Sequence, residues 1–335
     1  MSIEAGSPLS ASHAKAANWL LQGRERVPTA VIKDLQKRRD FPGLIYFIVH
    51  WLTIAASAWL VYLSLGTAWV WPAMVVYGSI SVMLFAPMHE CWHWTAFRTR
   101  WLNDAVGCIC AFFIWRPFFW ARYLHTAHHT YTQLEGHDTD VVKVPNSLAG
   151  YVYYMSGIGF WKGSLGWYWR GLSGRWNAFD RTFLPEVEFG RASIEIRIQI
   201  AILVALLMVS WWFESSAILW FWLLPRLLGE PMMRLLRMAE HAGAELSPNL
   251  LASVRTTYTN PFIRFYYWQM PYHAEHHLYP SVPFHRLAEL NKLTAPHLQC
   301  VGLGYFAVHR EIIRSAIRNG RSETVVKGST HGMSG

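Results

Sequence analysis

The sequence predicts an all-α integral membrane protein with four spanning helices in two hairpins and a cytoplasmic helical cap. Three observations predict this fold. Of 335 residues, 53% are hydrophobic and only 15% are charged, against about 25% charged in an ordinary soluble domain. Nineteen residues are tryptophan, a side chain that favours membrane interfaces. Basic residues flank the apolar runs, so the net charge of +9 indicates anionic lipid headgroups rather than nucleic acid.

Four apolar runs predict the spanning helices. With their flanks, they approach the roughly 20 residues that a helix needs to cross hydrocarbon. The predicted spans are Leu44–Leu65, Ala68–Pro87, Ile198–Trp212 and Ala217–Leu228. Gly66-Thr67 and Glu214-Ser215-Ser216 are short turns, so each pair of spans is predicted to form a hairpin. His50 lies inside the first span, where we expect a buried and hydrogen-bonded side chain.

Basic residues predict the orientation of the chain. Lys143–Arg197 is rich in lysine and arginine, and Arg226, Arg234 and Arg237 lie in or after the fourth span. By the positive-inside rule these segments face the cytoplasm. Both termini and every histidine-rich motif are then predicted on the cytoplasmic face of a cell or inner membrane.

One further apolar segment, Leu102–Trp120, is interrupted by polar residues and by Pro117. We expect one or two buried or re-entrant helices there rather than a full crossing.

The predicted organisation has three parts. Residues 1–43 form a cytoplasmic segment with no evident signal peptide; its basic amphipathic stretch, Ala30–Asp40, ends at Phe41-Pro42-Gly43. Residues 44–320 form the membrane domain and include a helix near Ala307–Arg318. Residues 321–335 are predicted to be a disordered tail.

Nine of the 16 histidines form the motifs MHECWH, RYLHTAHHT, RMAEHAG and PYHAEHHLYP. These candidate metal ligands are His89, His93, His125, His128, His129, His241, His273, His276 and His277. Residues three and four apart share one helix face, and imidazole binds iron, zinc, copper and nickel. Nine ligands exceed the four of a tetrahedral zinc and indicate two metal ions side by side. Iron is preferred because zinc has no redox chemistry.

Two other classes of protein remain open at this point. His89-Glu90-Cys91-Trp92-His93 also matches HExxH, the zinc-protease signature with a glutamate general base, but that interpretation leaves the later motifs unexplained. A metal transporter would need its ligands within the spans, whereas these motifs lie outside them.

The third histidine motif is the most specific. YTNP at residues 258–261 precedes PYHAEHHLYPSVP at residues 271–283. With the earlier motifs and the predicted hairpins, it resembles the membrane fatty acid desaturase family, which includes related hydroxylases. The resemblance covers roughly Leu44 to Leu290. It implies two irons held by the histidines of the three motifs, with His241 as a further ligand.

Polar residues near the motifs are candidates to orient the ligands, because metal-bound imidazoles usually donate their other N–H to a carboxylate or carbonyl. The candidates are Glu90, Asp138, Asp140, Glu240 and Glu275, with Asn260 as a further polar or water-mediated ligand. His137 and His285 lie outside the spacing of the motifs and are expected to be ordinary loop residues.

The predicted function is oxygen-dependent, di-iron oxidation of a lipid acyl chain, most simply desaturation, as the resemblance implies. The same centre could support hydroxylation, carotenoid oxidation or oxidative decarboxylation to a 1-alkene. The sequence contains no cytochrome b5-type domain, GxGxxG motif or ferredoxin cysteine pattern. An external donor is therefore expected: a ferredoxin, a rubredoxin, or cytochrome b5 with its reductase.

Overall fold

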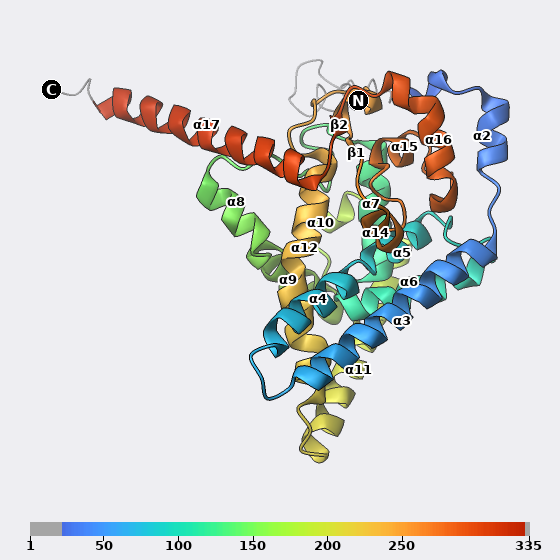
Figure 1. Ribbon diagram of the computed structural model, residues 1–335, viewed down its shortest axis with the longest axis vertical. Helices are drawn as coiled ribbons and strands as arrows, with labels where there is room; N and C mark the ends of the chain where they lie inside the picture. The colour runs from blue at the N-terminus through green and yellow to red at the C-terminus, as the bar shows by residue number, and fades with distance from the viewer. Residues whose placement is uncertain (1–21, 332–335) are drawn as a thin grey trace, which may run out of the picture.

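A computed structural model describes residues 22–331, and over this range the chain is almost entirely helical (Figure 1). The longer helices are α3 (Asp40–Ser64), α4 (Val70–Val82), α6 (Arg100–Ile114), α7 (Phe118–Thr130), α9 (Ile158–Ser173), α11 (Phe189–Trp212), α12 (Leu224–His241) and α17 (Tyr305–His331). The shorter helices are α2 (Thr29–Leu35), α5 (Phe85–Trp92), α8 (Leu148–Met155), α10 (Ala178–Arg181), α13 (Leu250–Ser253), α14 (Pro261–Tyr266), α15 (His273–Leu278) and α16 (Leu287–Thr294). The predicted all-α class is confirmed.

Short elements complete the described chain. Single 3-10 turns lie at Arg24–Arg26, Glu186–Glu188, Phe284–Arg286 and Ala295–His297. A π-helical turn, η3 (Leu219–Leu223), leads into α12. Two strands of two residues each, β1 (Thr256–Thr257) and β2 (Val301–Gly302), pair in parallel. This small pairing is a minor departure from an all-helical chain.

Three described helical segments are long and apolar enough to cross a membrane: Asp40–Ser64, Val70–Trp92 and Glu186–Trp212. They contain or overlap the first three predicted spans. The predicted fourth span, 217–228, is not among them, so the predicted count of four spans is not confirmed. This segment continues through η3 into α12, where Arg226, Glu230, Arg234 and Arg237 interrupt the apolar character.

The segment between the first two motifs folds as two helices. α6 and α7 meet at an angle of 99°, and only together are they long and apolar enough to cross a membrane. Trp115 adopts a left-handed backbone with φ of 57°, and Pro117 begins the new direction. The Glu195 carboxylate on α11 accepts the backbone N–H groups of Phe118 and Phe119. It thus supplies partners to otherwise unpaired donors at the start of α7.

Two expectations about the ends of the chain differ from the structure. α3 begins at Asp40 and includes Phe41-Pro42-Gly43, because proline is tolerated in the first turn, where its missing N–H has no helical partner. α17 continues to His331, so the backbone is helical over residues 321–331 where a disordered tail was predicted. The predicted absence of a signal peptide concerns residues that lie mainly outside the described range.

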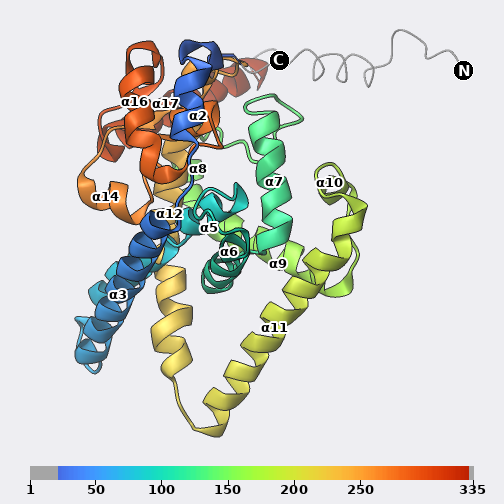
Figure 2. The ribbon, with the colours of Figure 1, turned by 90° about the vertical axis from the view of Figure 1, so that its right-hand side faces the viewer.

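The first hairpin is fastened by a polar contact inside it. The His50 ring is buried, and its Nε2 lies 2.9 Å from the carbonyl oxygen of Ile80 on α4. The prediction of a buried, hydrogen-bonded histidine is confirmed. The turns of this hairpin and of α11–η3 lie at one end of the molecule (Figures 1 and 2). α5, α7 and α15 lie toward the other end, where the histidines gather.

α4 and α12 cross with their backbones in contact. A Cβ atom added at Gly229 would lie 2.2 Å from the Gly78 carbonyl oxygen, and one added at Gly78 would lie 2.0 Å from the Pro225 oxygen. Only glycine allows this approach, as is common where membrane helices pack tightly. The crossing matters for the site because α4 continues into α5, which bears His89, and α12 ends at His241.

We expect Gly229→Ala to destabilise the protein by about 1–3 kcal/mol, the usual cost of overpacking. The added methyl group meets backbone, which cannot move aside without separating the two helices. Thermal unfolding of the detergent-solubilised protein measures the effect. Gly190→Ala on α11 is the matched control, because nothing lies within 4 Å of its added Cβ. Equal melting temperatures for the two variants would contradict the role assigned to this crossing.

Candidate metal centre

Four segments bring the nine predicted histidines together. α5 contributes His89, with His93 just after its last residue; α7 contributes three histidines, α12 ends at His241, and α15 contributes three more. Five imidazoles form what we call group 1: His89, His93, His125, His129 and His276. One nitrogen from each lies within 4.8 Å of the others.

Group 2 lies directly beside group 1. His128, His241 and His277 offer nitrogens within 4.8 Å of one another. His273 joins them through its Nε2, which lies 3.0 Å from His241 Nε2. The rings of His129 and His277 stack at 4.0 Å between centroids, which places the two groups side by side. The fold therefore gathers all nine predicted residues in one place.

Helix geometry explains why adjacent histidines enter different groups. Successive residues on an α-helix point about 100° apart, whereas residues four apart nearly coincide in direction. On α7, His125 and His129 therefore share group 1 while His128 points to group 2. On α15, His276 enters group 1 and His277 enters group 2. Each HxxHH motif thus supplies imidazoles to both groups.

The nitrogen–nitrogen distances fit metal coordination. The Nε2 atom of His125 lies 3.0 Å from that of His93 and 2.9 Å from that of His129. The Nε2 atoms of His276 and His129 are 3.1 Å apart. Two nitrogens bound at about 2.1 Å to one ion and about 90° apart would be separated by about 3.0 Å. These separations suit an ion with more ligands than a tetrahedral zinc.

Buried nitrogens without partners support the same conclusion. Both ring nitrogens of His89 and the Nε2 of His277 are buried without a hydrogen-bond partner in the described structure. Buried polar atoms are nearly always satisfied, so these atoms indicate missing ligands. All members of both groups are histidines, and an all-imidazole set suits iron, copper, nickel or zinc rather than magnesium or calcium.

Comparison with known proteins identifies the family to which this arrangement of histidines belongs. The family model described as fatty acid desaturase matches residues 66–309. The match covers most of the chain and includes all nine histidines. The chain belongs to the fatty acid desaturase family. It is accordingly an oxidoreductase, and its matched region lies inside the predicted domain of residues 44–320.

Several named relatives are desaturases. The chain is 24% identical over 256 residues to the sn-1 oleoyl-lipid 12-desaturase of Arthrospira platensis, covering 71% of this chain and 69% of that protein. It is 31% identical over 111 residues to the Delta(12) fatty acid dehydrogenase of Crepis alpina, covering 33% and 28%. It is 23% identical over 263 residues to the chloroplastic omega-6 fatty acid desaturase of Spinacia oleracea, covering 71% and 54%. The last two relatives are matched over well under two thirds of their length.

Three of the histidines use their Nδ1 atoms to contact other protein atoms. Their Nε2 atoms are thereby directed toward the centre of the histidine groups. His128 Nδ1 lies 2.7 Å from Asp138 Oδ1. His277 Nδ1 lies 3.2 Å from the hydroxyl of Thr132, and His273 Nδ1 lies 3.3 Å from the sulfur of Met270. Contacts of this kind fix the orientation of a metal-binding imidazole.

Two more of the predicted carboxylates, Glu90 and Glu240, lie close to the histidines. Glu90 Oε1 lies 3.8 Å from His276 Nδ1, and its other oxygen accepts the Thr95 hydroxyl at 2.7 Å. Glu90 is fully buried, a poor position for the water-activating base of a metalloprotease. Glu240 Oε2 lies 3.8 Å from His273 Nε2. Asp140 instead pairs at 2.6 Å with Arg237 and so acts one step further out.

Two predicted residues do not face the groups. Asn260 is exposed, and its side chain accepts the Ile263 N–H at the start of α14. Glu275 accepts hydrogen bonds from Thr256 at 2.5 Å and from Asn291 and Thr294 at 2.8 Å. It anchors α15 to β1 and α16, because a residue next to His276 on a helix points elsewhere. Adjacency in sequence was a misleading signal for Glu275.

Sequence reasoning missed several side chains around the groups. Thr132 bridges the carbonyl oxygen of His128 and the His277 ring. Gln133 donates to the carbonyl oxygen of His241 at 3.3 Å, and the Tyr267 hydroxyl donates to Glu240 at 2.7 Å. Threonine three residues after the HH pair, in HHTYT, was the available signal for Thr132. The others depend on tertiary packing alone.

Burial and neighbouring charges set the protonation of side chains in and beside the site. Burial, with the neighbouring His128, lowers the pKa of His241 to about 3, and burial also lowers the pKa of His277. The neutral imidazole favoured in this way is the form that binds metal. Burial raises the pKa of Asp140, but Arg237 and then Arg116 outweigh it and bring the value to about 2. Asp140 is therefore a permanent anion beside the site.

Proposed function

We propose that the protein is an oxygen-dependent, di-iron oxidase of lipid acyl chains, and that the reaction is desaturation. The observation that carries the proposal is the division of nine imidazoles into two adjoining groups. One iron would be held by His89, His93, His125, His129 and His276, and the other by His128, His241, His273 and His277. Family membership supports the lipid substrate.

Two irons in these groups would supply the power to activate dioxygen and remove hydrogen from an unactivated C–H bond. Overall, the acyl chain loses two hydrogens, the donor supplies two electrons with two protons, and O₂ becomes two waters. The protein buries both groups, orients His128 through Asp138 and orients His277 through Thr132. Electrons are proposed to come from a ferredoxin, a rubredoxin, or cytochrome b5 with its reductase.

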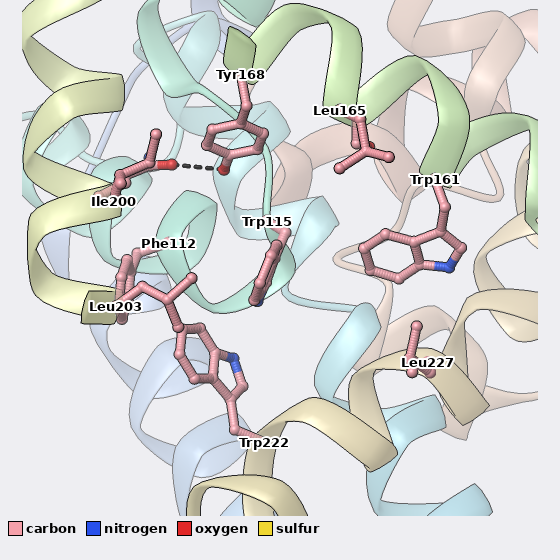
Figure 3. Close-up of a pocket in the computed structure, with 11 residues that line it drawn as sticks. Phe112, Trp115, Trp161, Leu165, Tyr168, Ile200, Leu203, Trp222 and Leu227 are labelled. Carbon is pink, nitrogen blue, oxygen red and sulfur yellow. Dashed lines mark hydrogen bonds between the residues drawn. The ribbon is translucent and has the colours of Figure 1, made fainter. Parts of the chain in front are cut away.

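An apolar cavity suited to an acyl chain lies among the membrane helices (Figure 3). It measures about 340 Å³ and is lined mainly by aromatic and aliphatic side chains, with Trp115, Trp161 and Trp222 pointing into it. Its main polar feature is the Tyr168 hydroxyl, which donates to Gln199 at 2.6 Å. A second cavity of about 430 Å³ shares Phe112 and Gln199 with it. Volumes of this size accommodate small ligands.

The first cavity is lined by residues of α6, α9, α11, η3 and α12. Figure 2 shows the turn after α11 at one end of the molecule and α7, which bears three of the histidines, toward the other. We propose that the histidine end faces the cytoplasm of a cell or inner membrane, with both termini. A lipid chain would then enter from the bilayer while the donor docks from water. The positive-inside pattern of the sequence supports this orientation.

The test is a direct product analysis. Protein purified in lipid nanodiscs receives iron, a ferredoxin system, oxygen and a panel of acyl substrates, and products are identified by mass spectrometry. We expect two irons per chain and a product two hydrogens lighter at unchanged carbon number, with none formed under nitrogen. An added oxygen would indicate hydroxylation, and an alkene one carbon shorter would indicate decarboxylation. Absence of any oxidised acyl product despite two bound irons would reject the substrate class.

A further inference from the structure

Three arginines surround a small buried cavity between the histidines and the apolar cavity. Arg116 comes from the break between α6 and α7, and Arg226 and Arg234 come from α12. We call these three residues the arginine cluster. The cavity measures about 10 Å³, which is room for about one water. Its other walls include Phe85, Phe160 and Met233.

The charges of this cluster do not balance. Glu230 is paired with Arg226 at 2.7 Å and with Arg234 at 2.5 Å, so one carboxylate serves two guanidinium groups. Arg226 also donates to the carbonyl oxygen of Ile114 at 2.9 Å. The nearby Asp140 forms an ion pair with Arg237 at 2.6 Å. The third arginine of the cluster is thus left without a carboxylate.

Arg116 is 6% exposed, and within residues 22–331 no carboxylate lies within ion-pair distance of it. Its Nε is buried without a hydrogen-bond partner. Its guanidinium lies against the rings of Phe85 and Trp92, each 5.7 Å from the ring centroid. Asp140 attracts Arg116 only from beyond ion-pair distance, and a buried charge without a close partner is unfavourable. The cluster therefore has the charge and the free donors to bind an anion.

The position of the cluster ties such an anion to the reaction. The Phe85 and His89 rings lie 5.8 Å apart, and the Trp92 and His89 rings lie 5.7 Å apart. Phe85 and Trp92 contact Arg116 on one side and His89 on the other. An anion at Arg116 would be separated from group 1 by a single aromatic layer.

The apolar cavity adjoins the cluster from the membrane side. Trp115, Trp161 and Leu227 line the apolar cavity, and each is a chain neighbour of a residue that lines the small one. The Arg226 guanidinium lies 4.6 Å from the Trp161 ring centroid. A ligand that fits both spaces has one anionic end and a long apolar tail.

We propose that the arginine cluster binds the carboxylate of a free fatty acid, whose tail occupies the apolar cavity and whose first carbons lie nearest the histidines. This inference rests on the proposed function and defines its substrate class. Arginine presents a planar fork that matches a carboxylate. Because the cavity holds only about one water, the proposal requires Met233, an unbranched and adaptable side chain in its lining, to move when the carboxylate binds. Esters lack the charge that the cluster recognises.

The test measures binding without turnover. Purified protein in nanodiscs, kept under nitrogen, is titrated with radiolabelled dodecanoate and with methyl dodecanoate. Wild-type protein should bind the acid more tightly by a factor of about 10 to 100, as expected for a charged hydrogen bond. Arg116→Gln should abolish this preference while leaving the affinity for the ester unchanged, and Arg116→Lys should restore part of it. Arg181→Gln, an exposed arginine paired with Glu186, should keep the full preference.

Three results would overturn the inference. The first is that wild-type protein binds acid and ester with equal affinity. The second is that Arg116→Gln loses affinity for both ligands together. The third is that a phosphate-bearing lysolipid binds more tightly than the free acid, in a way that depends on Arg116. Failure of the proposed function would look different. It would appear as the absence of any oxidised product, whatever the binding preference.

Discussion

The His276→Ala protein is expected to lose the iron of group 1, to keep that of group 2, and to lose measurable oxidation of acyl chains. His276 Nε2 lies 3.1 Å from His129 Nε2, so the imidazole closes one edge of the proposed coordination polyhedron. Alanine removes that ligand and leaves a buried gap that no described side chain fills. Iron per chain, measured by mass spectrometry, and product formation with a ferredoxin system test the prediction.

The neighbouring histidine gives a sharp control. His277→Ala should also halve the iron content, but by emptying group 2, because the two side chains enter different groups. The double variant of both positions should lose both irons. Combining His276→Ala with His129→Ala should lose no more than one, since both belong to group 1. His137→Ala, outside both groups, should keep two irons. A double variant of His276 and His277 that retains one iron would contradict this grouping.

The sequence was sufficient to predict which histidines meet, because their spacing obeys helix periodicity. The sequence could not predict how the nine histidines are divided between group 1 and group 2. On α7 alone, His125 and His129 can be assigned to one face and His128 to another. Which face then meets His276 rather than His277 depends on how α15 packs, and α15 follows α7 by more than 140 residues. Long-range packing carries no local sequence signal.

The arginines of α12 show that the sequence does not reveal which charges are buried. Arg226, Arg234 and Arg237 are predicted to mark the cytoplasmic side, although Arg226 lies inside the predicted fourth span, 217–228. In the structure Arg226 and Arg237 are buried and make ion pairs with Glu230 and Asp140. The positive-inside rule describes loops that flank a membrane. It does not distinguish them from an inward-facing helix whose charges are compensated by a carboxylate one turn away, as for Arg226, or by one distant in sequence, as for Arg237.

The Asp138→Asn protein is expected to bind the iron of group 2 about 10 to 100 times more weakly, as for other residues that orient metal-bound histidines. Asp138 holds His128 Nδ1 at 2.7 Å and is itself fixed by the backbone N–H groups of Gln133 at 2.8 Å and Asp140 at 2.9 Å. Asparagine keeps the shape but removes the charge that makes His128 a stronger donor to metal. Competition with a chelator of known affinity measures the loss.

The control for this change lies in the same loop. Glu135 is exposed and paired with Lys143 at 2.7 Å, so Glu135→Gln removes a similar charge without touching a histidine and should leave iron affinity unchanged. The iron of group 1 should be retained in Asp138→Asn, because the contact reaches His128 and not His125 or His129. Equal weakening of both irons would mean that Asp138 supports the fold of the loop as a whole. If only the iron of group 2 binds more weakly, the carboxylate of Asp138 controls the affinity of one metal alone. It would do so although α7 supplies ligands to both groups.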